Sequence, residues 1–305
     1  MHLLKPFAHR GLHALLLLGV VLAAATPTVA HEFWFAPVES PQPVDATVSL
    51  RLEVGEFFVG DAAGLSQRQC AKMQLFTARA QTDLKPFLSA DNTEAEVLLA
   101  LGNRGTHLVT FDSEPLRITL PADRFSAYLH DEGLDFVKAQ REKAGKAEQP
   151  VRERYYRNVK TLIHAGSVAR QGQPVDLTYA KRTGQKLEIL PMRNPAVLVP
   201  GDTLRLQVEF EGKPLAGALV KAWHHHNKQL LVVRSITTAN GDAEVTLPYA
   251  GGWMISVVHM VPATDDTEVD WDSYWGNLSF SMPTGTKGGG KPIAKLPAKR
   301  PAKRK

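Results

Sequence analysis

The sequence contains a single cysteine, Cys70, among its 305 residues. One cysteine cannot form an internal disulfide, so no disulfide within the chain supports the fold. Cys70 lies well inside the chain in LSQRQCAKM, and we interpret it as a small buried hydrophobic residue rather than a reactive thiol or a metal ligand. The sequence also lacks a nucleophile elbow with a Ser-His-Asp order and a glycine-rich phosphate loop, which argues against two large classes of enzyme.

Long hydrophobic runs are scarce as well. The longest, ALLLLGVVLAAA at 14–25, is shorter than the roughly 20 residues that span a bilayer. It follows Lys5 and Arg10 and precedes TPTVA, which is the order typical of a secretory signal peptide. We therefore predict a cleaved signal peptide at 1–30, with an uncleaved anchor as the alternative. Export without disulfides is typical of the bacterial periplasm, where we expect this protein.

Acidic residues are missing from both ends of the chain. Of the 36 Lys and Arg, two lie in the predicted signal and eight in 283–305, whereas all 31 Asp and Glu lie between these segments. The excess positive charge of the chain therefore comes from its ends, and the core is acidic. We predict that 283–305, which is rich in Gly, Pro, Ala and Lys, is a disordered basic tail that could touch an anionic surface. No nucleic-acid-binding module is present.

Short alternating runs such as TVSLRLEV, LRITL and WMISVVHM predict a mainly β protein. The exception is about 122–145, where apolar residues recur at helical spacing and predict one helical insert. We expect an N-terminal β-rich domain at 31–189 that carries this insert. Seven or so short strands at 190–282 predict a C-terminal immunoglobulin-like β-sandwich. We expect the basic-aromatic cluster RERYYR at 152–157 to pair with acidic residues of the core rather than to bind an anion.

His31 is the first candidate functional residue, because it would open the mature chain. A terminal histidine offers its α-amine and its imidazole to one metal ion, and the amine has a pKa of about 7.7–8.0, so a metal can displace its proton. Two such nitrogens with a second histidine suit Cu(II), Ni(II) and related ions. The alternative is an ordinary polar residue at the start of the first strand.

Further candidates lie at the ends of predicted strands. In KAWHHHN, alternation places His224 and His226 on the face of Val220 and Ala222, with His225 on the other face. His259 ends the apolar row of WMISVVHM, where a satisfied core histidine is the alternative. Asp270 and Asp272 flank Trp271 and could orient ligand imidazoles from a second shell.

Three segments resemble a known family. AHEFWF at the predicted mature start, the stretch from GQKLEILP to ALVKAW, and the ending GGWMISVVHMVPATDDTEVDWDSYWGNLSFSM are similar to the periplasmic family called domain of unknown function 4198. The resemblance implies a periplasmic metal-binding protein with a sandwich domain that serves nickel or cobalt uptake. It carries over to His31, His259 and, through the AWH segment, His224, whereas His225 and His226 rest on chemistry alone.

Together these features predict a non-enzymatic periplasmic protein that binds a divalent transition metal (Ni, Co or Cu) for uptake or homeostasis. The predicted ligands are His31, His224, His226 and His259, with Asp270 and Asp272 behind them, and the predicted partner is a metal permease in the inner membrane. Two alternatives remain open at this stage. One is a copper-dependent oxidase built on the N-terminal histidine, and the other is a metal-free carbohydrate-binding or adhesion module that uses Trp271 and Trp275.

Overall fold

The computed structural model describes residues 31–90, 96–168 and 176–284. The predicted signal peptide lies outside the described residues, and so does almost all of the predicted basic tail. Among the described residues, no helix combines the length and the apolar character needed to cross a membrane.

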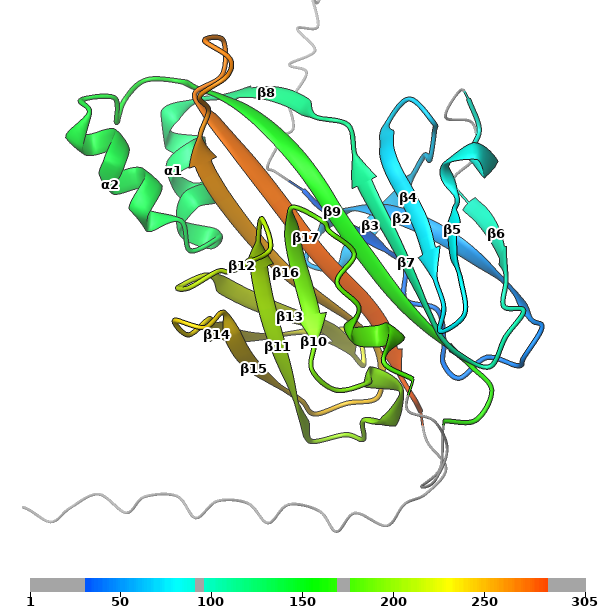
Figure 1. Cartoon of the computed structure of the whole chain (residues 1–305). Helices are drawn as coiled ribbons and strands as arrows, with labels where there is room; N and C mark the ends of the chain where they lie inside the picture. Colours follow the sequence, from blue (N-terminus) through cyan, green and yellow to red (C-terminus); the bar gives the residue numbers. More distant parts are fainter. Residues whose placement is uncertain (1–30, 91–95, 169–175, 285–305) are drawn as a thin grey trace, which may run out of the picture.

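A nine-stranded sheet forms the centre of the molecule. Its strands follow the order β14-β13-β16-β17-β9-β7-β4-β5, and β8 also pairs with β9. The strands are β4 (Cys70–Phe76), β5 (Gln81–Asp83), β7 (Gly105–Ser113), β8 (Leu116–Leu120), β9 (Val151–Ala165), β13 (Leu219–His226), β14 (Gln229–Ile236), β16 (Gly251–Pro262) and β17 (Trp271–Met282). The two long strands β9 and β17 run side by side across the molecule and form a parallel pair (Figure 1).

Two smaller sheets cover opposite faces of this central sheet. The first has the order β1-β2-β3 with β6 also paired to β2, and the second has the order β10-β11-β12 with β15 also paired to β11. The first consists of β1 (Glu32–Phe35), β2 (Thr47–Glu56), β3 (Val59–Ala63) and β6 (Glu96–Ala100). The second consists of β10 (Leu187–Pro191), β11 (Asp202–Phe210), β12 (Lys213–Pro214) and β15 (Asp242–Leu247). Short 3₁₀ helices occur at η1 (Lys85–Phe87), η2 (Thr178–Ala180) and η3 (Pro195–Val197).

Alternation along the central strands separates the two faces. On β16, Ile255 and Val257 join the core under the second small sheet, whereas Met254 packs with Trp34 of β1 on the other side. On β9, Leu162 belongs to the core of the second sheet and Val159 to the core of the first. We call the side covered by the second sheet face A and the side covered by the first sheet face B.

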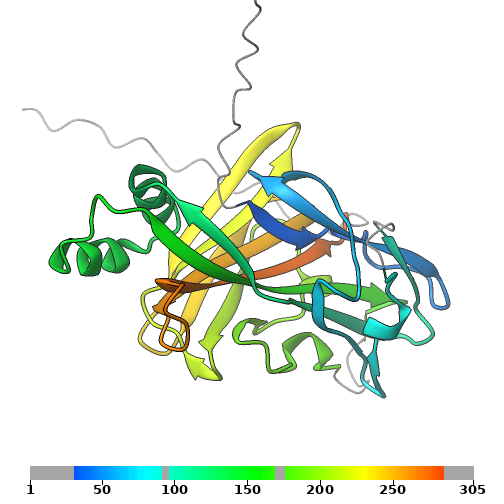
Figure 2. The same cartoon turned by 90° about the horizontal axis from the view of Figure 1, so that it is seen from above.

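The predicted helical insert is present, but as two helices, α1 (Ala122–Asp131) and α2 (Asp135–Lys143). The break occurs at Gly133, whose φ of 70° is left-handed and ends the first helix. A Cβ at Gly133 would lie 2.8 Å from Cβ of Leu219, so the glycine also allows close packing on β13. The helices cover one end of face B, where Phe125 and Leu129 pack with Val258 and Met260 of β16. Figure 2 shows them at the end of the molecule opposite the cyan part of the chain.

The strands form where alternation predicts them. TVSLRLEV lies in β2, whose burial alternates over its first six residues, and LRITL and WMISVVHM lie in β8 and β16. The mainly β, sandwich-like prediction is confirmed. The predicted domain boundary near residue 190 falls within β10, and the central sheet continues across it because β17 pairs with β9.

Cys70 is fully buried in the core between the first small sheet and the central sheet. Burial raises the pKa of its thiol to about 12, so the thiolate that reactive and metal-binding cysteines require is disfavoured. The structure therefore agrees with its interpretation as a small core residue.

Candidate functional site

His31 lies beside the last residue of β2. The register of β1 on β2 pairs Glu32 with Gly55, which places His31 next to Glu56. The imidazole Nε2 of His31 is 3.6 Å from Oε1 of Glu56, and each side chain is 40 % exposed. An imidazole and a carboxylate are thus brought together at a position that solvent and ions can reach.

A strained turn follows Glu56. Phe57 and Phe58 connect β2 to β3 with φ values of 54° and 59°, a conformation in which bulky residues are rare and glycine or asparagine is usual. Three contacts from the central sheet and β1 hold the turn. Nε2 of His225 donates a hydrogen bond to the Phe57 carbonyl at 2.9 Å, Phe57 packs on Trp223, and Phe58 packs on Trp34. The packing that fixes this turn also fixes Glu56 beside His31.

A cavity of about 410 Å³ opens next to this pair. Four acidic and two basic residues line it, together with Gly55, Phe57 and Trp223; the charged residues are Glu32, Glu56, Asp131, Glu132, Lys221 and Arg234. Its lining is therefore acidic, which favours a cation.

The floor of this cavity is a buried charge cluster that joins β1, α1 and β13. Lys221 is 3 % exposed, and its Nζ lies 2.5 Å from Oε2 of Glu132 and 3.7 Å from Oε1 of Glu32. Asn277 of β17 donates to the other Glu32 oxygen at 3.0 Å. Burial raises the pKa of Glu132 to about 7, although the charge of Lys221 opposes the shift. The residue that follows His31 is therefore anchored in the core.

The predicted ligand histidines do not converge on His31. His225 contacts the turn that follows Glu56 on face B, so its neighbours His224 and His226 point to face A. His259 shares face A, because it continues the row of Ile255 and Val257. The central sheet thus lies between His31 and the other three predicted ligands. His225, which the prediction left aside, contacts the turn that follows Glu56.

His224 and His226 form a stacked aromatic row rather than a converging pair. Nδ1 of His224 donates to the Gly252 carbonyl at 2.8 Å, and its ring stacks on Trp253 with centroids 4.5 Å apart. His226 stacks on Tyr249 at 3.7 Å. An imidazole binds a metal through a lone pair in the plane of its ring, whereas these rings turn their faces to one another. Burial lowers the pKa of His224, because it disfavours the charged form of the ring.

His259 lies at the opposite end of β16 from His224. Seven residues separate it from Gly252, which corresponds to about 23 Å along a strand. Its ring packs edge-on against Phe210 with centroids 4.6 Å apart, and burial lowers its pKa to about 4 with weak opposition from Glu211. His224 and His259 therefore cannot bind the same ion.

The depressed pKa of His259 predicts an acid-dependent loss of stability. An unfolded histidine has a pKa of about 6.5, so between pH 4 and 6.5 the unfolded chain binds the proton more readily than the folded protein. The stability that the protein gains from keeping His259 neutral is therefore fully present above pH 6.5. It is lost as the pH falls towards 4, by up to about 3 kcal/mol. Urea unfolding of the wild-type protein and His259→Phe at pH 7 and pH 4.5 should show a smaller acid sensitivity in the variant. The same change at His130, whose side chain is 80 % exposed, should leave that sensitivity unchanged.

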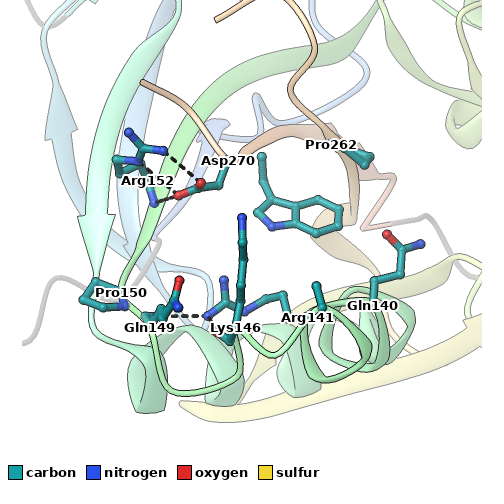
Figure 3. Close-up of a pocket in the computed structure, with 10 residues that line it drawn as sticks. Gln140, Arg141, Lys146, Gln149, Pro150, Arg152, Pro262 and Asp270 are labelled. Atoms are coloured by element: carbon teal, nitrogen blue, oxygen red, sulfur yellow. Dashed lines mark hydrogen bonds and ion pairs between the residues drawn. The ribbon is translucent and has the colours of Figure 1, made fainter. Parts of the chain in front are cut away.

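Asp270 and Asp272 bind arginines instead of histidines. Arg152 donates to Asp270 through its backbone nitrogen and its guanidinium at 2.9–3.2 Å, and Arg154 donates to Asp272 at 2.6 and 2.8 Å. Figure 3 shows the Arg152–Asp270 pair at the wall of a cavity of about 620 Å³, with Lys146 reaching towards it from the end of the helical insert. The predicted second-shell carboxylates therefore belong to ion pairs of the fold.

The tryptophans of the carbohydrate alternative are covered by the helices. Trp271 and Trp275 are 7 % and 1 % exposed and belong to the core beneath α1 and α2. Trp275 stacks on Tyr128 at 5.5 Å. Both rings are too deeply buried to offer the open face on which a sugar would stack, although Trp271 is one of the residues that line the cavity of about 620 Å³.

Within the described part of the chain, no group of three or more His, Cys, Asp and Glu side chains is arranged to hold a metal ion. Of the four predicted ligands, His31 is the one for which the described residues include a carboxylate within 4 Å of the imidazole, that of Glu56. Sequence reasoning missed Glu56, because Phe57 and Phe58 are not typical turn residues and the local sequence does not predict the hairpin that they form.

The fold and site define a three-layer β-sandwich protein with an exposed histidine–carboxylate pair at the start of its first described strand. The chain belongs to the family named Domain of unknown function (DUF4198), whose model matches residues 28–261. No curated protein matches the chain. Among solved structures, the fibronectin(III)-like modules of Clostridium thermocellum CbhA are similar over 82 % of this chain and 94 % of theirs, at 9 % identity and a TM-score of 0.19. That TM-score is too low to carry an argument.

Proposed function

We propose that this protein is a periplasmic, non-catalytic binder of a divalent transition-metal ion, and that its metal site is built on His31. The observation that carries the proposal is the 3.6 Å approach of Nε2 of His31 to the Glu56 carboxylate, with both groups open to solvent. Cleavage of the predicted signal peptide after Ala30 would free the α-amine of His31 as a third donor. Two of the three donors would then come from one residue.

The chemistry of these donors suits borderline metals. A neutral amine and an imidazole favour Ni²⁺, Co²⁺, Cu²⁺ or Zn²⁺, and affinities for such ions generally peak at copper. A carboxylate adds negative charge, and the acidic cavity next to the pair strengthens the local attraction for a cation. Glu32 is bound to Asn277 and close to Lys221, so the strand that carries His31 is anchored next to the site.

The proposed role is the delivery or buffering of a metal ion for uptake or homeostasis, with a metal permease of the inner membrane as the partner. The copper-oxidase alternative needs a second imidazole at the same ion. The nearest candidate is His225, whose Nε2 is engaged by the Phe57 carbonyl.

The test is a calorimetric titration of mature protein, confirmed by mass to begin at His31, with Ni²⁺, Co²⁺, Cu²⁺ and Zn²⁺. Removal of partners outside the ligand shell typically weakens metal binding by 10–100-fold, so loss of a direct ligand in His31→Ala or Glu56→Gln should weaken it by about 100-fold. A version with one extra residue ahead of His31 loses the chelating amine and should bind similarly weakly.

His130 and Asp135 provide a matched control, because Nδ1 of His130 also lies 3.6 Å from Oδ1 of Asp135 at an exposed position. His130→Ala and Asp135→Asn should bind metal as tightly as the wild-type protein. Equal metal affinities of the wild-type protein and His31→Ala would overturn the proposal. Equal affinities of the native and extended forms would show that the α-amine of His31 is not a ligand.

A further inference from the structure

Arg157 is the one arginine of the RERYYR cluster that does not pair with an acid. Arg152 and Arg154 bind Asp270 and Asp272 as expected, but no described carboxylate lies within ion-pair distance of the Arg157 guanidinium. Arg157 is 8 % exposed, and its Nη1 is buried without a hydrogen-bond partner. A buried arginine without a carboxylate at ion-pair distance is costly, since the side chain keeps its charge near neutral pH. Glu32 and Glu153 favour that charge only from farther away.

Aromatic rings surround this guanidinium. Its central carbon lies 4.7 Å from the ring centroid of Trp275, 5.1 Å from that of Tyr155 and 5.9 Å from that of Phe33. Cation–π contacts offset part of the desolvation, but they leave the in-plane N–H donors of the buried Nη1 unused. These donors form the planar fork that binds a carboxylate through two parallel hydrogen bonds.

Arg157 lines a cavity of about 380 Å³ on face B, between the first small sheet and the central sheet. Most of its wall is apolar, and the apolar side chains are Phe33, Val54, Ala63, Phe111, Pro115 and Leu116. Ser113 lies beside the arginine, and its hydroxyl oxygen accepts the backbone N–H of Arg157 at 3.0 Å. The volume lies within the range of about 300–1,000 Å³ that is typical of small-molecule sites.

The charges of the lining determine which anion fits. Arg157 and Arg68 are positive, and Glu114 at the exposed rim is negative, so the lining has a net charge of +1. A dianion would leave one charge unmatched, whereas a monoanion neutralises the lining. A ligand that fits this cavity would place an anionic group at the buried Arg157 and a hydrophobic body along the apolar wall.

We propose that this cavity binds an amphiphilic monocarboxylate, whose carboxylate pairs with Arg157 and whose apolar body packs against Phe33 and Phe111. The site is separate from the His31–Glu56 pair and does not depend on metal. It would give the protein a second ligand, such as a medium-chain fatty acid.

Calorimetric titration of the full mature chain with decanoate, and with decanol as its neutral counterpart, tests the proposal. A hydrogen-bonded pair with a charged group discriminates by roughly ten- to a hundredfold, so decanol should bind at least about tenfold more weakly than decanoate. Arg157→Met should lose this preference and bind the two compounds alike. Leu116→Trp, a change at an exposed wall residue that fills the cavity, should weaken binding of both.

Thermal unfolding separates a ligand site from a structural role. If Arg157 served to stabilise the fold, replacing it would lower the melting temperature. We expect Arg157→Met to raise the melting temperature instead, because the change removes an unpaired buried charge. Decanoate should raise the melting temperature of the wild-type protein more than that of the variant, because the variant binds it more weakly. Equal binding of decanoate and decanol by the wild-type protein, or no binding of either, would overturn the proposal, and so would a lower melting temperature of Arg157→Met together with unchanged decanoate affinity.

Discussion

Replacing Lys221 with methionine is expected to lower the free energy of unfolding by about 3–5 kcal/mol at pH 8. The lysine is buried between two carboxylates, at 2.5 Å from Glu132 and 3.7 Å from Glu32. Methionine fills similar space but carries no charge, so it leaves both carboxylates in the core without a cation. Breaking a buried ion pair by removing one partner is costly for this reason.

The loss should depend on pH in a defined direction. Burial already raises the pKa of Glu132 to about 7 in the presence of Lys221, and removal of the lysine should raise it further. A glutamate has a pKa of about 4.3 in the unfolded chain. When its pKa in the folded protein is higher, the protonated carboxyl stabilises the fold fully below about pH 4.3. This stabilisation is lost as the pH rises through the folded pKa. The destabilisation in Lys221→Met should therefore be smaller at pH 5 than at pH 8.

Urea unfolding of both proteins at the two pH values measures this effect. The double variant Lys221→Met with Glu132→Gln should recover part of the loss at pH 8, since one of the two unpaired charges is gone. Arg205→Met is the surface control, because Arg205 and Glu244 form a pair at 3.4 Å in which each side chain is 63 % exposed. That change should alter stability by less than about 1 kcal/mol. A Lys221 variant as stable as this control would contradict the prediction.

Lys160→Met is expected to have an effect of similar size, about 3–5 kcal/mol. Lys160 of β9 is 2 % exposed on face A, and its Nζ lies 2.5 Å from Oε1 of Glu188 on β10. The pair links the central sheet to the second small sheet. Glu188 also accepts hydrogen bonds from the backbone nitrogen and hydroxyl of Thr183 at 2.6 and 2.8 Å, and these should keep the loss near the lower end of the range.

Arg205→Met serves as the control here as well, because Arg205 and Glu244 belong to β11 and β15 of the second small sheet. Each of the two side chains is 63 % exposed, so solvent screens the pair. Chemical unfolding should show a large loss of stability for Lys160→Met and less than about 1 kcal/mol for Arg205→Met. If both changes had the same small effect, the Lys160–Glu188 pair would not contribute to holding the second sheet in place.

The local pattern of the sequence predicts much of the fold. Apolar residues at every second position place Ile255 and Val257 on one face of β16, and the same rule places His224 and His226 on the face of Val220 and Ala222. The helical insert is visible from its spacing, although its break at Gly133 is visible only through the packing of that glycine on Leu219. Alternation and periodicity are properties of neighbouring residues, so a sequence shows them directly.

The candidate site was predicted only in part. His31 stands out because it follows a predicted cleavage site, but its partner Glu56 is brought to it by the pairing of β1 with β2. Sequence reasoning grouped His31 with His224, His226 and His259, yet it could not tell which face of the central sheet β1 would cover. The structure places β1 on face B and those three histidines on face A.

The sequence by itself determined the β-rich class, the presence of a helical insert, and the faces on which the strand residues lie. Only the tertiary structure decided how the charges are matched. Glu132 lies 89 residues from the Lys221 that it binds, and Arg152 and Arg154 bind Asp270 and Asp272, each 118 residues away. Arg157 has no carboxylate of the described residues within ion-pair distance. Strand alternation depends on the geometry of adjacent peptide units, whereas the pairing of a buried charge depends on which distant segments the folded core brings together.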